Sequence, residues 1–122
     1  MRRIMLCTLA AAAAAAIPTS AAAVQAKTTL KLRADPQGAL KFNTGTLHAK
    51  PGTVTIRLTN PSSSGKPHAV EIEGKGKEKR SAVLDPGETG SVTMTVKKGT
   101  YEFYCTVGNH KAAGMKGKLI VR

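Results

Sequence analysis

Short segments in which apolar and polar residues alternate make up much of the chain after Ala26, and they limit what it can fold into. In the clearest one, residues 53–59, every second side chain is aliphatic, and residues 92–96 repeat the pattern. Successive side chains on a β-strand point to opposite faces, so each segment has one face to bury in a sheet. No stretch after Ala26 has a sustained helical period, and we therefore expect an all-β fold.

Gly, Pro, Asn and Asp punctuate these segments, as they do in β-sandwiches and barrels. Turns are expected at residues 35–38, 51–52, 60–65 and 85–87, and residues 74–80, which include no apolar side chain, are expected to form a solvated loop. About eight strands remain, which a Greek-key β-sandwich of two sheets would accommodate. They are expected at residues 30–33, 39–43, 47–50, 53–59, 68–72, 92–96, 101–105 and 118–122.

Residues 1–26 differ from the rest of the chain and have the features of a secretory signal peptide. Two arginines follow Met1, residues 4–17 are apolar and rich in alanine, and small residues near the end offer a cleavage site. Cleavage is expected after Ala26, with Ala23 as the alternative, and a leader retained as a membrane anchor stays open. We expect an exported protein, periplasmic or otherwise extracytoplasmic, whose single domain spans residues 27–122.

Removal of the leader leaves one cysteine, because Cys7 leaves with it and Cys105 remains. A lone cysteine cannot form an intramolecular disulfide, and a free thiol is a liability in an oxidising compartment. On its own, Cys105 would be interpreted as a small buried hydrophobic residue. His110 and Met115 follow it closely, however, and a thiolate bound to a metal ion is no longer exposed to oxidation. The sequence therefore favours a metal site.

A thiolate, an imidazole and a thioether together form a soft ligand set, which suits copper better than magnesium, calcium or manganese. A trigonal copper site has two histidines and one cysteine, with a methionine as weak axial ligand. The second histidine is supplied upstream by His68, in the segment KPHAVEIEG. Alone, His68 would more often be structural, but beside Cys105, His110 and Met115 it completes the set. His48 has no such neighbours and is interpreted as structural or exposed.

The alternation of side chains also predicts where two of these ligands point. Tyr101, Phe103 and Cys105 share one face of their strand, and the apolar Phe103 must face the core. On the earlier strand, His68 shares its face with Ile72. Both ligands are therefore expected on the core side, at strand ends beside loops.

Three parts of the chain resemble the plastocyanin-like blue copper proteins, the cupredoxins. Residues 99–105 (GTYEFYC), His110 and residues 113–121 (AGMKGKLIV) together resemble the closing segment of that family. The segment around His68 resembles the one that holds the first ligand, and residues 38–42 (GALKF) resemble the loop beside the copper. The resemblance covers nearly all of the chain after the leader.

This resemblance implies a Greek-key sandwich with one type 1 copper ion, held by His68, Cys105 and His110 in the equatorial plane and by Met115 along the axis. Four residues separate Cys105 from His110, where plastocyanins typically have two, and this spacing is more similar to azurin and auracyanin loops. Ala69 follows His68, where many relatives have an asparagine that helps to tie the ligand loops together.

We predict a mononuclear type 1 copper protein that carries one electron between redox partners by Cu(I)/Cu(II) cycling. Electrons are expected to pass through the edge of His110, and Tyr104, beside Cys105, resembles the second electron port of the family. An enzyme is not expected, because multicopper oxidases and nitrite reductases need further histidines and this chain has three. An exported copper carrier or storage protein is the alternative function.

Charge and composition limit the partners. Without Arg2 and Arg3 the chain has seventeen basic against seven acidic residues, a net charge of +10, which speeds encounters with acidic partners at low salt. Nucleic acid is not expected, because the four aromatic residues do not interleave with the lysines. We expect a monomer that docks on acidic redox proteins, and peripheral association with a membrane stays open.

Overall fold

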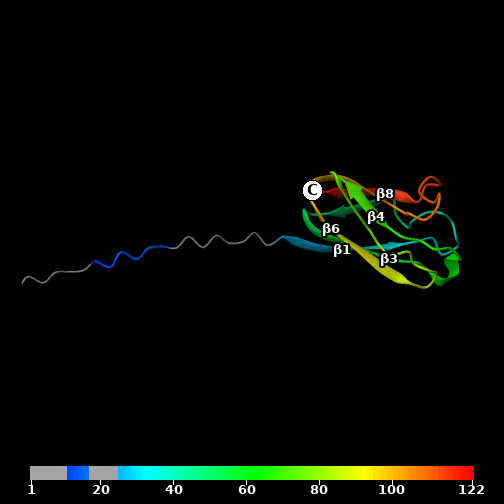
Figure 1. The fold of residues 1–122 in the computed structure, drawn as a ribbon, viewed down its shortest axis with the longest axis horizontal. Coiled ribbons are helices and arrows are strands. Elements are labelled where there is room, and N and C mark those ends of the chain that lie inside the picture. Colours follow the sequence, from blue (N-terminus) through cyan, green and yellow to red (C-terminus); the bar gives the residue numbers. More distant parts are fainter. Residues whose placement is uncertain (1–10, 17–24) are drawn as a thin grey trace, which may run out of the picture.

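The computed structural model describes residues 11–16 and 25–122, and the fold consists of strands from the second range. Eight strands form two sheets that pack face to face (Figure 1), which confirms the expected all-β sandwich. No helix within the described ranges is long and apolar enough to cross a membrane. The strands are β1 (Ala26–Arg33), β2 (Thr46–Ala49), β3 (Gly52–Thr59), β4 (Glu71–Gly74), β5 (Lys77–Arg80), β6 (Thr89–Val96), β7 (Gly99–Tyr104) and β8 (Lys116–Val121), and a 3₁₀ turn, η1 (Ser62–Ser64), lies between β3 and β4.

The expected signal peptide, residues 1–26, lies mostly outside the described residues, and its cleavage stays a prediction. Ala26 is the first residue of β1 and pairs with Gly52 of β3. A cut after Ala23 would leave this pair intact, whereas a cut after Ala26 would remove it.

The two sheets differ in size and in the pairing of their strands. The smaller has the order β1-β3-β6 and the larger the order β2-β8-β7-β4-β5. β1 pairs with β3 and β2 with β8 in parallel, and all other neighbours are antiparallel. Each sheet therefore mixes both kinds of pairing, and β7, which leads to Cys105, lies in the middle of the larger sheet.

The core forms between the sheets from the apolar halves of the alternating strands. In the small sheet Val54 lies opposite Met94 and Ile56 lies opposite Val92, and all four side chains are buried. The large sheet contributes Phe103, whose ring lies 5.7 Å from that of Phe42, centroid to centroid. Burial of this apolar surface is the main force that holds the two sheets together.

The strand expected at residues 39–43 is absent, and this prediction was wrong. Only one isolated bridge forms there, between Ala34 and Phe42. The Asp35 carboxylate accepts hydrogen bonds of 3.0 Å from the backbone N–H groups of Gln37 and Ala39. Such side-chain bonds to the local backbone favour a turn over a strand.

The loop expected at residues 74–80 is instead the hairpin of β4 and β5, so this prediction of an irregular segment was wrong. Lys75 and Gly76 form its turn with φ values of 51° and 75°, as in a two-residue turn of type I′. Every side chain of β5 is exposed. This edge strand is held by backbone pairing alone, and its charged side chains protect the sheet edge from further pairing.

Candidate metal centre

Cys105 lies directly after β7 and inside the protein. Its side chain is buried, as are those of Tyr101 and Phe103, which alternate with it along the strand. The expected inward orientation of Cys105 is therefore confirmed. Its backbone N–H donates to the carbonyl of Met115 at 3.0 Å, which joins the start of the ligand loop to its end.

His110 and Met115 lie in the loop that connects β7 to β8. The N–H of His110 donates to the carbonyl of Val107, and the N–H of Met115 donates to the carbonyl of His110 at 3.1 Å. Gly114, with a φ of 110°, lets the chain turn back between them. His110 is half-buried, whereas the side chain of Met115 is fully buried. The loop thus closes on itself through the backbone of Met115.

His68 comes before β4 and is held by a different segment. It forms an isolated bridge with Leu84, with N–H···O distances of 3.0 and 2.7 Å. Its side chain faces the core as expected, but the expected alternation does not hold, because Ala69 and Glu71 are buried too. The backbone N–H of Ser81 donates to the carbonyl of Val70, and the N–H of Val70 donates to the Ser81 hydroxyl. Residues 81–84 therefore lie alongside residues 68–70 and help to bury them.

Asn60 fixes the loop that leads to His68, and sequence reasoning did not single it out. It is fully buried, and its side-chain amide donates to the carbonyls of Lys66 at 2.8 Å and Leu84 at 3.0 Å. Its side-chain oxygen accepts a 2.6 Å hydrogen bond from the hydroxyl of Ser64. The only signal in the sequence is an asparagine at the end of a strand, a position that is equally typical of a turn.

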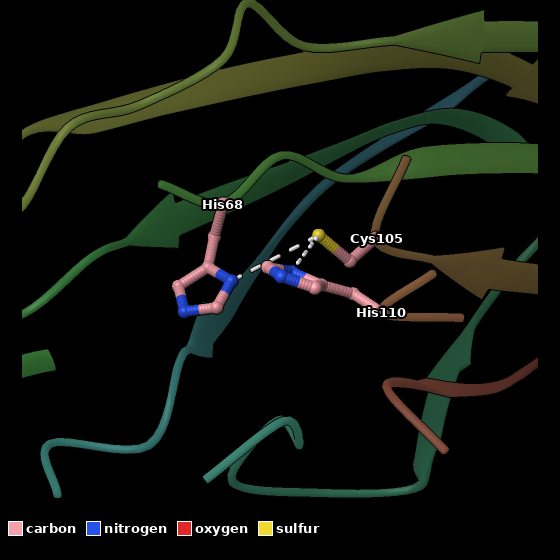
Figure 2. Close-up of side chains that lie close together, drawn as sticks. All are labelled: His68, Cys105 and His110. Carbon is pink, nitrogen blue, oxygen red and sulfur yellow. Dashed lines mark hydrogen bonds between the residues drawn. The ribbon is translucent and has the colours of Figure 1, made fainter. Parts of the chain in front are cut away.

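Figure 2 shows the three side chains converging from separate parts of the chain. The sulfur of Cys105 lies 3.9 Å from Nδ1 of His68 and 3.5 Å from Nδ1 of His110. One donor atom from each residue lies within 4.8 Å of the others. Donors that share one first-row metal ion through bonds of about 2.0–2.3 Å lie roughly 3.5 Å apart. The spacing of these donors therefore fits a single ion between them.

The environment keeps both imidazoles neutral. Burial, followed by electrostatic repulsion from His110 and Lys66, lowers the pKa of His68 to about 4. Burial, followed by the charge of Lys66, also lowers the pKa of His110. A metal ion needs the neutral imidazole, so both rings are ready to bind at neutral pH. Among the described residues, Nε2 of His68 is buried without a hydrogen-bond partner, so packing and the backbone hold this ring.

Residues 28–122 match the family model described as copper binding proteins, plastocyanin/azurin family. The chain belongs to this family. The plastocyanin of Chlamydomonas reinhardtii is 36% identical over 109 residues, which cover 82% of this chain and 70% of that protein. Plastocyanin A'/A'' of Nicotiana tabacum is 33% identical over 95 residues, covering 69% of this chain and 90% of that one. Among solved structures, auracyanin B is similar with a TM-score of 0.68 and 27% identity, over 78% of this chain and 88% of its own.

The family and the geometry together identify the metal as copper and the site as a type 1 copper centre of a cupredoxin. Of the four residues expected from the sequence, His68, Cys105 and His110 bring their donor atoms together. Met115 ends the same loop, where its backbone forms hydrogen bonds with Cys105 and His110, and its role as the fourth ligand stays a prediction. His48 lies on β2 with its side chain exposed, away from this centre, which agrees with one of its two interpretations.

A second group of polar side chains surrounds Tyr104, the neighbour of Cys105 in the chain. The Tyr104 hydroxyl donates a 2.6 Å hydrogen bond to Glu73, and this bond, with burial and Glu71, raises its pKa. The ammonium group of Lys111 lies 3.7 Å from the centre of the Tyr104 ring and 3.5 Å from a carboxylate oxygen of Glu102. Tyr104 points away from the core, opposite to Phe103 and Cys105, but its ring is partly covered by this group.

Proposed function

We propose that the protein is an exported, monomeric one-electron carrier, in which His68, Cys105, His110 and Met115 would hold one copper ion. The observation that carries the proposal is the convergence of one sulfur and two Nδ1 atoms at separations that suit a single ion. When bound, copper supplies the Cu(I)/Cu(II) couple that accepts and releases the electron.

The chain's own residues limit how much the centre rearranges when its charge changes. The Cys105 amide is bonded to the Met115 carbonyl, and the Met115 amide to the His110 carbonyl. His68 is fixed from another direction, by two backbone bonds to Leu84. Ligand positions that are set by the surrounding hydrogen bonds stay nearly the same in both oxidation states, which favours fast electron transfer.

Electrons would enter and leave at the edge of His110. Its imidazole is half-buried, and the next small residues, Ala112, Ala113 and Gly114, are exposed. These residues give a small apolar patch with little side-chain bulk between the ring and a docked partner. Interfaces for brief redox encounters are small, so a patch of this kind is sufficient.

Positive charges beside this patch would favour acidic partners. Lys66 and Lys116 are exposed and Lys111 is half-exposed, although Lys111 also pairs with Glu102. The net charge of the full chain is +12, so the long-range field has the same sign. Attraction to an acidic partner would raise the association rate, and added salt would lower it.

Voltammetry of the copper-loaded protein, together with its rate of electron self-exchange, tests this function. We expect a reversible one-electron couple and fast self-exchange. An irreversible wave, or rapid transfer of copper to a metal-free acceptor protein in place of electron exchange, would contradict the proposal and favour a copper carrier.

A further inference from the structure

The outer face of the small sheet carries only positive and hydroxyl side chains. Each of β1, β3 and β6 presents four side chains outward there, and the strands lie together in one layer (Figure 1). Four of these side chains are Lys27, Lys31, Arg33 and Arg57, and all the others are threonine or serine. We call this surface, the outward residues of β1, β3 and β6, the basic–hydroxyl face.

The acidic residues of the chain are placed elsewhere. Of its seven Asp and Glu residues, none lies on the basic–hydroxyl face, and four lie on strands of the large sheet: Glu71, Glu73, Glu78 and Glu102. None of the four cations of the basic–hydroxyl face forms an ion pair within the described residues. The strands of the large sheet carry charges of both signs, since Lys77, Lys79, Arg80, Lys116 and Lys118 accompany these four carboxylates. The basic–hydroxyl face carries positive charge alone, and it is not neutralised locally.

The basic–hydroxyl face is hollowed where its cations are densest. A depression of about 460 Å³ is lined by Lys31, Arg33 and Arg57 together with Asn43, Thr59, Thr89 and the buried Leu32. Lys31 and Arg57 are directly paired across β1 and β3. Like charges side by side repel, and an anion between them removes that cost. Guanidinium groups bind phosphate oxygens in pairs, and hydroxyl groups can complete the hydrogen bonds, so the chemistry of the depression suits a phosphate group.

We propose that the basic–hydroxyl face binds the surface of an anionic phospholipid membrane, with a headgroup phosphate in the depression between Lys31, Arg33 and Arg57. A specific protein interface would need aromatic, methionine or aliphatic anchors, and this face has none. Diffuse attraction between several cations and anionic headgroups needs no such anchors. Cross-strand hydroxyl pairs, such as Thr55 and Thr93 at 2.9 Å, occupy the positions between the charges.

This mode of binding would keep the copper end free. β1 leads into the loop of residues 34–43, at the same end of the molecule as the ligand loop of His110 (Figure 1). A protein lying on the basic–hydroxyl face would hold its strands along the membrane plane and leave the His110 edge uncovered. It would then diffuse in two dimensions toward partners at the same membrane.

Vesicle co-sedimentation tests the proposal with copper-loaded protein purified from the exported fraction. We expect binding to mixed phosphatidylglycerol and phosphatidylcholine vesicles, and none to phosphatidylcholine alone. Each cation at such a surface contributes a factor of about five to the partition coefficient, so the Lys31→Gln/Arg57→Gln variant should bind roughly 25-fold more weakly. The matched control is Lys77→Gln/Lys79→Gln on β5, which removes the same charge from the other sheet and should weaken binding less than about fivefold.

Four results would overturn the proposal. Equal binding to neutral vesicles would exclude the charge argument, and equal losses in the two variant pairs would show that net charge acts without this face. Release of the protein from the vesicles by inorganic phosphate, at a concentration equal to that of the lipid phosphate, would mean that the depression binds a free anion. Unchanged vesicle binding by the Lys31/Arg57 variant, with slower electron transfer to an acidic protein, would assign the face to a protein partner. The visible spectrum of each copper-loaded variant reports whether it is folded.

Discussion

Replacement of Asn60 by alanine is the perturbation that most directly tests how the ligand loops are held. The Asn60 side chain is fully buried and makes three hydrogen bonds, two as donor to the carbonyls of Lys66 and Leu84 and one as acceptor from Ser64. Each such bond contributes about 1 kcal/mol net, and a buried polar group left without a partner costs about 1–3 kcal/mol. We expect Asn60→Ala to lower the free energy of unfolding by about 3–5 kcal/mol.

The copper site should be affected as well, because both carbonyls bonded by Asn60 belong to the segments that hold His68. Leu84 accepts from the Asn60 amide and also from the His68 backbone N–H. Denaturant unfolding of the metal-free protein measures the loss of stability, and chelator competition should show faster copper release. At about 4–8 °C per kcal/mol for a domain of this size, the melting temperature should fall by more than about 12 °C.

Asn43→Ala is the matched control. Asn43 is exposed, and its side-chain oxygen accepts one 2.9 Å hydrogen bond from the backbone of Arg33. Its removal should cost less than about 1 kcal/mol, because water replaces the lost partner. If the free energies of unfolding of Asn60→Ala and Asn43→Ala differ by less than about 1 kcal/mol, the net contribution of one typical hydrogen bond, the argument from burial is refuted.

Two further predictions follow from shifted pKa values. The pKa of His68 is about 4 in the folded protein and 6.5 as its ordinary value, so the unfolded chain binds a proton more readily between these two pH values. The metal-free protein should therefore keep its full free energy of unfolding above pH 6.5 and lose about 3 kcal/mol of it as the pH falls to 4. Denaturant unfolding at a series of pH values measures this, and a His68→Gln variant that shows the same loss would rule out His68 as its source. The pKa of the Tyr104 hydroxyl should lie above the ordinary range of tyrosine, because its hydrogen bond to Glu73 and burial favour the neutral form. Subtracting the ultraviolet titration of Tyr104→Phe from that of the wild type isolates this group. An ordinary pKa in the difference would contradict the contact with Glu73.

The sequence predicted best where burial alone decides the outcome. Phe103 is aromatic and has to enter the core, so alternation correctly oriented Cys105 two residues later. The same logic located β3 and β6, whose buried faces consist of aliphatic side chains and Met94. The sequence also pointed to His68, Cys105 and His110, whose donor atoms the structure brings together, because their donor chemistry is specific and recognising it required no knowledge of the fold.

Prediction of secondary structure from the sequence failed where turns and backbone hydrogen bonds, and not apolar side chains, determine the local conformation. β5 has no apolar side chain, and it forms because a turn at Lys75 and Gly76 returns the chain to the edge of the sheet. The strand expected at residues 39–43 is replaced by a turn, since the Asp35 carboxylate takes up backbone N–H groups. Asn60 was overlooked for a similar reason, because its three partners are far apart in the sequence or outside regular strands.

The central claim is that Cys105, His68 and His110 bind one copper ion with Met115 in support, and the visible spectrum of the Cu(II)-loaded protein tests it most directly. We expect an intense thiolate-to-copper charge-transfer band that reductant bleaches and oxidant restores. Cys105→Ser should abolish the band, whereas His48→Gln, a change at an exposed residue of β2, should leave it intact. A Cys105→Ser protein that keeps the band, or a wild type that stays colourless with one equivalent of Cu(II), would contradict the account.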